Sequence, residues 1–598
     1  MKRFIIPDAV LNTDRIICRL LAAWCLYIST TLFVKDGLFK LDFNQGRSLL
    51  IPLLCIFVYF TALSFVAYLM RGYNTDSWFL FIGASFCVAR WGVSAPSANK
   101  FFFSVALGIV YSLFLVWIFR ENEALISKIR PGKKLVVFFG ILFFLISCFI
   151  LSAITCLRYK TFSSPNFDFG IFVNMFHNMK ETGLPLVTCE RDRLLSHFAV
   201  HISPVYYLLL PFYLLFPSPY TLQIGQAVVL MAGIVPVILL AKHYKLSGKV
   251  TVLFSALYVF YTALSTGCFY DIHENCFLTP LLLFVFLFFE KGKPIPMYLC
   301  VLLTLGVKED AAVYLIFFAL FVIFSKKKYI HGIIVAAISV SYFLLCSFIM
   351  EKYGLGMMVN RFDNLILNKD EGLLGAIKTV LLNPGYVLTQ LTSTSNAGAG
   401  KLIYILQLML PLGFLPFCTK KPSRWLLISP LLVNLLTMYV YQYDVGFQYS
   451  FGIIAFLFYA AIGNAAELSP ALKKNAFTLA VAFSLCFYTV SVVSTFGSYA
   501  KSAAENGEKY ARMEEILDTI PEDASVCAST FLLPHIADRD VIYEVAYHEN
   551  TGDVDYVVLD ARYGNYRADM LRYLEAGYEE ILSEKGMIVI LRHPDLKK

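Results

Sequence analysis

Asp168 is the residue whose surroundings best fit acid–base chemistry. It lies in the polar stretch "SSPNFDFGIFVNMFHNMKETGLP", directly before a run with helical periodicity. A carboxylate acts as a general base when it lies beside a reacting hydroxyl group. A carboxylate at this place can also cap the helix, because helix N-termini favour negative charge. The two roles are compatible, so Asp168 is a candidate catalytic residue with helix capping as the alternative interpretation.

The residues after Asp168 predict an amphipathic helix lying on the outer membrane surface. Apolar and polar residues separate onto two faces at helical spacing. The apolar face would comprise Phe169, Phe172, Val173, Phe176 and Met179, and the polar face Gly170, Asn174, His177 and Asn178.

Two histidines, His197 and His201, follow four residues apart and would share one face of a helix. Such a pair can bind a metal ion, but metal sites need further ligands. Polar residues at the membrane interface are the alternative interpretation. Residues 198–216 also contain several prolines, so we expect this segment to be re-entrant or interfacial rather than membrane-crossing.

Further ionisable residues lie in turns between apolar runs. The turn "FYDIHENC" contains Asp271, His273 and Glu274, and Lys308 and Glu309 stand next to Asp310 at another junction. Ionisable groups beside hydrocarbon are costly, so they usually pair with one another or serve a site. An ion pair of Lys308 with Glu309 or Asp310 would explain this triplet equally well.

The segment "YQYDVGFQYS" adds Tyr443 and Asp444 to the same predicted side of the membrane. We expect the acidic and histidine-bearing turns to gather there, and this convergence favours a functional site. The sequence contains no GxxxxGK[ST], HExxH or GxSxG motif, so an ATPase, zincin or serine hydrolase mechanism has no support.

The elements that position these residues are predominantly membrane helices. Of the 598 residues 58% are hydrophobic and only 15% are charged, which excludes an ordinary soluble protein. Apolar runs of helical membrane length predict about fifteen transmembrane helices. The net charge of +8 resides in short basic clusters between the runs, a pattern of membrane topology rather than of nucleic-acid binding.

Placing the basic clusters in the cytoplasm puts the N-terminus inside and the C-terminal region outside. We expect additional transmembrane helices over 1–133 and a transmembrane core over 134–498, with outer loops 157–197 and 351–400. Alternating strand and helix patterns predict a small extracytoplasmic α/β domain over 499–598. Its hairpin would turn at Lys585-Gly586.

Several motifs resemble the DUF2079 family of predicted membrane proteins. They are "NFDFGIFVNMFHNMKETGLP", "SHFAVHISPVYYLLLPFYLLFPSPYTLQIGQ", "LGVKEDAAVYL" and "YQYDVGFQYSFGIIAFLFYAAI", followed by "DASVCASTFLLPHIADRDVIYEV" and "DYVVLD". The resemblance covers roughly residues 150–565. That family is in turn similar to the GT-C superfamily of glycosyltransferases, whose members use polyprenyl-phosphate-linked sugars on the outer face of a membrane.

The resemblance implies a membrane glycosyltransferase of the bacterial cell envelope, with a polyprenyl-phosphate sugar donor and a glycan or lipid acceptor. Asp168 matches the acidic residue of the first outer loop and would accept or position the acceptor hydroxyl. The leaving phosphate would need cations, and arginine suits phosphate best. The cations available on the outer side are Lys308, Arg191, Arg193 and Arg361.

Many GT-C loops carry paired acidic residues, whereas "NFDFG" holds only one. A requirement for a divalent metal ion therefore stays open, with Asp271, His273 and Glu274 as its candidate ligands. Two other classes of function are alternatives: a transporter or lipid flippase, and a non-catalytic binding or sensor protein. The first predicts internally repeated halves, and the sequence has no repeat. The second predicts that Asp168 is dispensable.

Overall fold

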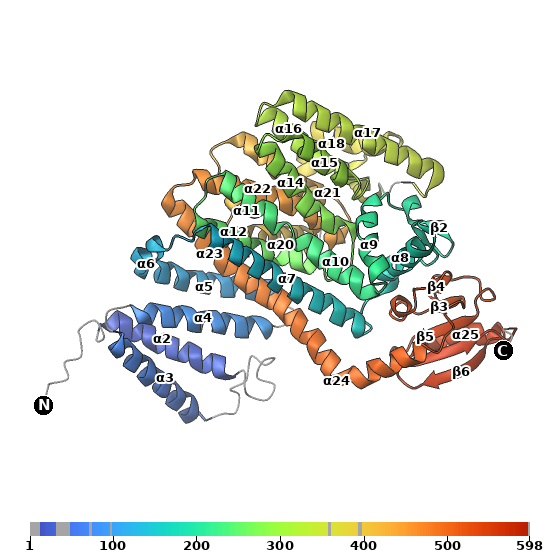
Figure 1. The fold of residues 1–598 in the computed structure, drawn as a ribbon, viewed down its shortest axis with the longest axis horizontal. Helices are drawn as coiled ribbons and strands as arrows, with labels where there is room; N and C mark the ends of the chain where they lie inside the picture. Colours follow the sequence, from blue (N-terminus) through green and yellow to red (C-terminus); the bar gives the residue numbers. More distant parts are fainter. Residues whose placement is uncertain are drawn as a thin grey trace.

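The computed structural model describes residues 12–31, 48–70, 74–95, 99–356, 360–392 and 397–595. Residues 1–11, 32–47, 71–73 and 96–98 of the predicted N-terminal region lie outside this description. So do residues 357–359 and 393–396 of the predicted loop 351–400 and residues 596–598 of the predicted C-terminal domain. The described chain is a large helical array followed by a small sheet domain (Figure 1). The predicted class, a helical membrane protein with a small C-terminal α/β domain, is confirmed.

The N-terminal helices lie at one end of the array, where α5 (Lys100–Glu121) packs along α23 (Pro470–Tyr488) of the core (Figure 1). They are α2 (Thr13–Thr30), α3 (Leu50–Leu69), α4 (Thr75–Val93), α5 (Lys100–Glu121) and α6 (Glu123–Lys128). A buried ion pair between Arg19 and Asp76, 2.8 Å apart, connects α2 to α4. Each charge satisfies the other, as burial in an apolar environment requires.

The central array contains helices of very different length, from the six-residue α13 to the 28-residue α7. They are α7 (Lys133–Lys160), α10 (Pro219–Met231), α11 (Ile234–His243), α12 (Gly248–Val259), α13 (Thr262–Gly267), α14 (Leu278–Glu290), α15 (Pro294–Leu305), α16 (Ala311–Phe324), α17 (Tyr329–Tyr353), α22 (Phe451–Glu467), α23 (Pro470–Tyr488) and α24 (Ser494–Leu517). Within the described chain, eight helical stretches are long and apolar enough to cross a membrane, and three shorter apolar helices accompany them.

Burial separates central from peripheral helices. Residues 451–465 of α22 are all buried, so this helix is covered by protein on every side. In α3 only Ala67 is buried, and leucine, phenylalanine and isoleucine side chains cover its surface. An apolar helix left uncovered in this way is suited to contact with lipid.

Shorter elements occupy the loops. They are α8 (Ile171–Thr182), the hairpin strands β1 (Leu186–Val187) and β2 (Leu195–Ser196), α9 (Leu210–Leu215), α18 (Gly372–Leu382), α19 (Pro384–Thr392), α20 (Ala397–Met409) and α21 (Pro430–Leu436). Residues 198–216 contain only short helical segments, and none of them is a candidate membrane span.

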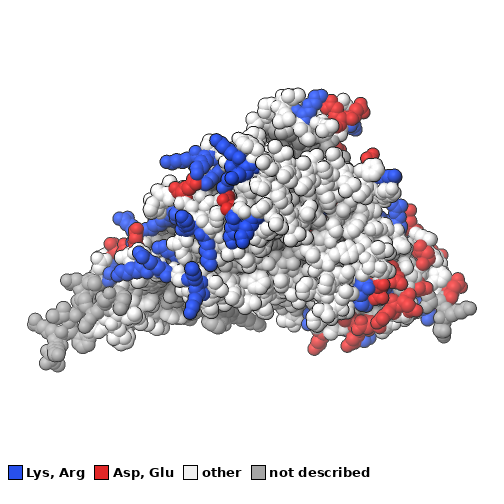
Figure 2. All heavy atoms as spheres, turned by 45° about the horizontal axis from the view of Figure 1, so that its top comes forward, with Lys and Arg blue, Asp and Glu red and all other residues white. Residues whose placement is uncertain are grey.

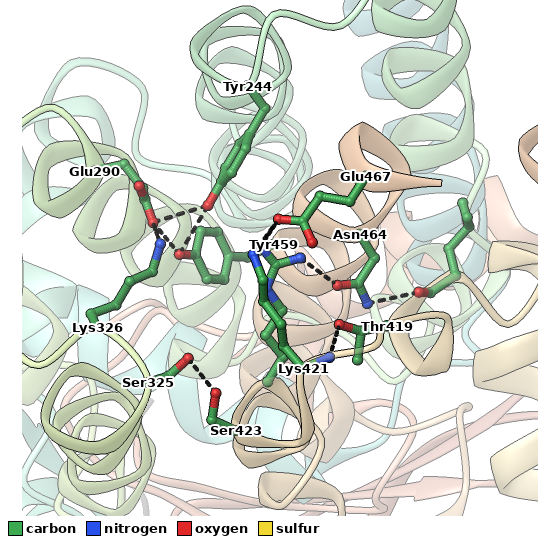
Figure 3. A network of polar contacts seen from close by, with 12 residues as sticks. Tyr244, Glu290, Ser325, Lys326, Thr419, Lys421, Ser423, Tyr459, Asn464 and Glu467 are labelled. Atoms are coloured by element: carbon green, nitrogen blue, oxygen red, sulfur yellow. Dashed lines mark hydrogen bonds and ion pairs between the residues drawn. The ribbon is translucent and has the colours of Figure 1, made fainter. Parts of the chain in front are cut away.

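A polar network joins four segments at the lysine-rich end of the array (Figure 3). Glu290, the last residue of α14, accepts hydrogen bonds from Tyr244, at 3.0 Å, and from Tyr459. It also pairs with Lys326 at 2.6 Å. Nearby, Arg424 donates to Asn464 of α22 at 2.9 Å. These bonds satisfy polar groups that the surrounding apolar helices would otherwise leave unpaired.

The C-terminal domain contains β3 (Val526–Ala528), β4 (Ile542–Glu544), β5 (Tyr556–Asp560), α25 (Tyr566–Glu575), β6 (Glu579–Glu584) and β7 (Ile588–Arg592). The strand order is β4-β3-β5-β7-β6. Strands β4, β3 and β5 are parallel, and β7 is antiparallel to both β5 and β6. The predicted hairpin is confirmed, and Gly586 supplies the positive φ of +70° that its turn needs. Strand β4 was not predicted from the sequence.

Charge is distributed unevenly over the surface. Lysine and arginine side chains gather at one end of the molecule, while acidic side chains concentrate over the C-terminal domain (Figure 2). A broad band with few charges separates the two regions. Such a band is the surface expected of a chain embedded in a bilayer.

Candidate active site

Asp168 lies at a strained point of the chain between α7 and α8. Its backbone has φ 69° and ψ −65°, a γ-turn conformation that is rare for residues other than glycine. The N-cap residue of α8 is Gly170, and no side chain caps the helix. The alternative interpretation of Asp168 as a helix cap is therefore wrong. Strain of this kind is held by the surrounding structure and is concentrated at functional sites.

Contacts with the C-terminal domain hold the loop of Asp168. The Asn166 side-chain amide donates to Glu544 at 2.7 Å and to the carbonyl oxygen of Cys189 at 3.2 Å. The Asn166 backbone N–H donates to the hydroxyl group of Thr530 at 3.2 Å. Residues from two strand ends of the sheet thus fix the segment that carries Asp168.

Helix α8 forms as predicted, but its polar face is not in contact with water. Asn174 is fully buried and donates to the backbone carbonyl oxygens of Ala537, at 3.2 Å, and Arg539, at 2.7 Å. The predicted apolar face, including Phe172 and Phe176, is buried as well. The prediction of a helix lying on the membrane surface is wrong, because the C-terminal domain covers the side that was expected to face solvent.

The Asp168 carboxylate is half-buried and has no hydrogen bond or ion pair within the described chain. Burial, together with the negative charges of Glu274, Asp271 and Glu190, raises the pKa of Asp168 to about 7, although Lys308 opposes the rise. A carboxyl group with this pKa exchanges its proton near neutral pH, as a general base must. Phe172, four residues after Asp168, packs against Tyr206 and His273, which both contact Glu274, at ring-centroid distances of 5.1 and 5.9 Å.

Glu274 is the centre of a buried polar cluster beside Asp168. Its carboxylate pairs with Lys308 Nζ at 3.0 Å and His273 Nδ1 at 3.0 Å, and accepts from the Tyr206 hydroxyl at 2.7 Å. Although burial opposes it, the neighbouring His273 and Lys308 hold the pKa of Glu274 below its usual value. Lys308 is the dominant charged partner, because burial lowers the pKa of His273 to about 3.

A cavity of about 150 Å³ lies next to this cluster. Polar residues of its wall are Lys308, Glu309, Asp310, His201, Arg361 and Asn434. His201 Nδ1 and Glu309 Oε1 are 2.9 Å apart, and Glu309 also accepts from the Ile202 backbone N–H at 3.1 Å. The structure therefore brings four predicted site residues to one cavity.

Asp310 also lines this cavity, although it was not among the site residues predicted from the sequence. One of its carboxylate oxygens is buried without a hydrogen-bond partner in the described part of the chain. Burial raises the pKa of Asp310, and Lys308 opposes that rise. Its position directly after Lys308-Glu309 was the available signal. Sequence alone does not tell which of two adjacent acidic residues is left unpaired.

Arg361 is the cation of the cavity that has no carboxylate partner within the described residues. Its guanidinium group lies 4.4 Å from the ring centroid of Tyr439 and 5.3 Å from that of Tyr449. Aromatic faces hold a guanidinium group in place while leaving its N–H donors available.

The three proposed metal ligands do not converge. Asp271 is ion-paired with Arg158 and accepts from Ser164 at 2.9 Å and Gln223 at 2.6 Å. Glu274 and His273 belong to the Lys308 cluster instead. No group of three or more metal-ligating side chains occurs in the part of the chain that the structure describes. The prediction of an Asp271–His273–Glu274 ligand set is wrong, because Arg158 already neutralises Asp271.

The remaining predicted residues have other surroundings. Arg191 and Arg193 are exposed, and His197 Nδ1 lies 3.0 Å from Glu190. Tyr443 packs against the ammonium group of Lys401, 5.3 Å from its ring centroid. Asp444 accepts from the Gly446 backbone N–H at 2.8 Å within its own turn.

A second cavity, of about 520 Å³, lies in the C-terminal domain. Its wall includes residues that follow or end the three parallel strands: Ser529, Thr530, Glu544, Val545 and Asp560. Ligands of α/β sheets bind at this edge, outside the carboxyl ends of parallel strands. Thr530 and Glu544 also hold the loop of Asp168, so the second cavity adjoins that loop.

Solved structures with a similar arrangement include ArnT from Cupriavidus metallidurans, bound to undecaprenyl phosphate and in the apo state. Both are 10% identical to this chain and cover 75% of it and 97% of ArnT, with TM-scores of 0.46 and 0.45. The arabinofuranosyltransferase AftD from Mycobacteria is 9% identical over 78% of this chain, with a TM-score of 0.42. The alignment covers 40% of AftD.

A comparison with curated proteins finds no match. The family model described as "Predicted membrane protein (DUF2079)" matches residues 158–580. This range holds the Asp168 loop, both cavities and most of the C-terminal domain. The chain is therefore a multi-pass membrane protein that belongs to the DUF2079 family.

Proposed function

We propose that this protein is a membrane glycosyltransferase that transfers a sugar from a polyprenyl-phosphate-linked donor to a hydroxyl group of a cell-envelope acceptor. The observation that carries the proposal is the Asp168 carboxylate. It is unpaired within the described chain, is raised in pKa to about 7, and lies near the Lys308–Glu274 pair. Sugar transfer from a phosphate needs a base for the acceptor hydroxyl and a cation for the leaving phosphate, and this part of the chain offers both.

In the proposed reaction the acceptor oxygen attacks the anomeric carbon of the donor sugar. Its proton passes to an oxygen of Asp168, a new glycosidic C–O bond forms, and the bond between the anomeric carbon and the phosphate oxygen breaks. The bonding pair leaves with the polyprenyl phosphate. Asp168 then releases its proton to solvent.

Arg361 and Lys308 are the residues best suited to the departing phosphate. Arg361 has no carboxylate partner within the described residues, and arginine donors match phosphate oxygens in pairs. Lys308 stays charged because Glu274, Glu309 and Asp310 raise its pKa, although burial opposes this. Both line the cavity that contains the unpaired oxygen of Asp310.

The acceptor would enter from the C-terminal domain. The cavity of about 520 Å³ offers Tyr563 and Tyr566 as aromatic platforms and Asp569 as a hydrogen-bond acceptor. Aromatic faces together with polar acceptors suit a polyhydroxylated ligand. This arrangement requires the C-terminal domain and Asp168 to lie outside the cell, with the lysine-rich end in the cytoplasm.

The test uses a strain that lacks the protein and carries plasmids for the wild type, Asp168→Asn or Asp370→Asn. Asp370 is an exposed aspartate of the loop between α17 and α18 and serves as the matched control. Surface glycans and the amount of protein in the membrane are measured in each strain. We expect the wild type and Asp370→Asn to restore the missing glycan and Asp168→Asn to fail at equal protein level. Full restoration by Asp168→Asn would refute the proposal.

A further inference from the structure

A pocket of about 690 Å³ lies at the lysine-rich end of the molecule, on the seam between the N-terminal helices and the core. Its walls come from α5, α6, α12 and α23 and from the turn between α11 and α12. The inner wall is apolar and consists of Phe119, Val250, Leu253, Ala256, Phe477 and Val481. The volume is in the range of small-molecule sites, about 300–1,000 Å³.

The rim of this seam pocket is packed tightly on one side. Gly248 begins α12, and a Cβ atom there would overlap the carbonyl oxygen of Pro131, which lies just before α7. Tyr244, earlier in the same turn, is held through its hydroxyl group by Glu290 in the network of Figure 3. Backbone packing and a hydrogen bond therefore define this wall of the pocket.

Four lysines surround the mouth of the seam pocket: Lys245, Lys249, Lys473 and Lys474. Lys474 pairs with Glu123 at 3.0 Å, and Lys249 donates to the Ile126 carbonyl oxygen at 3.3 Å. Lys245 and Lys473 have no ion pair within the described chain. Glu123 is the only acidic residue of the lining, so the mouth carries an excess of positive charge.

We propose that the seam pocket binds an anionic glycerophospholipid. The phosphate would lie between Lys245 and Lys473, and an acyl chain would follow the apolar wall between α12 and α23. Basic pockets between membrane helices recognise anionic lipid headgroups in this way. The lysine-rich end shown in Figure 2 extends this positive surface around the pocket. Lipid binding at this pocket does not depend on the sugar-transfer function proposed above.

The bound lipid would connect two parts of the chain. Helices α5 and α6 precede the range that matches the family, whereas α12 and α23 lie within it. An anionic lipid that contacts both groups stabilises their association, because any ligand that binds only the folded state shifts unfolding to higher temperature.

The test uses the full-length protein, purified in detergent and depleted of lipid. Its melting temperature is measured on titration with phosphatidylglycerol and with phosphatidylcholine of the same acyl chains, and retained lipid is identified by native mass spectrometry. We expect phosphatidylglycerol to raise the melting temperature and phosphatidylcholine to have little effect. The double variant Lys245→Gln, Lys473→Gln should need about thirtyfold more phosphatidylglycerol for the same rise in melting temperature.

Two further variants make the result specific. Lys291→Gln combined with Lys420→Gln removes two exposed lysines outside the pocket and should bind as the wild type does. Ala256→Phe fills the apolar wall without a change of charge and should abolish retention. Equal responses to the two lipids, or an unchanged response of the Lys245/Lys473 variant, would overturn the proposal. So would displacement of phosphatidylglycerol by an equimolar single-chain polyprenyl phosphate.

Discussion

The Asn166 side-chain amide donates a hydrogen bond of 2.7 Å to a carboxylate oxygen of Glu544, 378 positions later in the chain. Asn166 is two residues before Asp168, and Glu544 is the last residue of β4. This bond joins the proposed catalytic loop to the C-terminal domain. The domain therefore contributes directly to the conformation of the proposed catalytic loop.

Replacing Glu544 by alanine should loosen the loop of Asp168. The buried amide of Asn166 loses its carboxylate partner, and an unsatisfied buried donor costs about 1–3 kcal/mol. We expect faster hydrogen exchange in residues 163–171 and weaker glycan restoration. The control is Glu549→Ala, which removes an exposed carboxylate of the same domain. Unchanged exchange in the Glu544 variant would show that the contact does not hold the loop.

The rate of sugar transfer should depend on pH through Asp168. Its ionised form is the base, and its pKa is about 7, so the active fraction decreases as the pH falls below 7. The expected slope on the acidic side is about tenfold per pH unit. Incorporation of labelled sugar is measured in membranes from the wild-type and deletion strains between pH 5 and 8.5. A rate that increases on acidification would exclude Asp168 as the base.

Loss of the Lys308 charge should impair both stability and transfer. Lys308→Gln leaves Glu274 buried without its main charged partner, and breaking a buried pair costs about 3–5 kcal/mol. The double variant Lys308→Gln, Glu274→Gln removes both charges and should recover much of the melting temperature. We expect no recovery of transfer, because the phosphate-facing cation is still missing. Recovery of transfer together with stability would assign Lys308 a purely structural role.

The C-terminal cavity should affect the use of acceptor more than folding. Tyr563 is half exposed at the cavity wall, so Tyr563→Ala removes little buried surface. We expect a raised KM for acceptor, by about tenfold if one aromatic contact is lost, and an unchanged melting temperature. Leu571→Ala, which removes an exposed side chain of the same domain outside this cavity, is the comparison. Equal KM values for the two variants would remove the cavity from the acceptor path.

Local patterns in the sequence account for much of the fold. Apolar runs indicated the membrane helices because hydrocarbon excludes unpaired polar groups over a fixed thickness. After residue 520 the sequence alternates between strand-like and helix-like patterns. These patterns predicted β3, β5, α25 and the β6–β7 hairpin, because the periodicity of a strand or helix is visible within a single segment. Strand β4 was missed because it has only three residues, too few for a period to be recognised.

The identity of Asp168 as a candidate base came from its place in the sequence, but its chemical state did not. The sequence allowed helix capping, but Gly170 is the N-cap residue of α8 and no side chain caps this helix. Likewise, Asp271, His273 and Glu274 are neighbours in the chain. In the structure, however, Asp271 forms an ion pair with Arg158, and Glu274 forms one with Lys308. Those partners come from distant segments, and their approach depends on how the helices pack.

The sequence by itself determined that this is a membrane protein, which segments are helical, and which polar turns hold the ionisable side chains. These properties depend on hydrophobicity and on residue spacing within single segments. Only the tertiary structure decided that Asn174 faces the C-terminal domain, that Glu544 holds the loop of Asp168, and that Asp168 stays unpaired. The physical reason is that burial, ion pairing and pKa depend on groups brought close in space, and one segment does not contain its own partners.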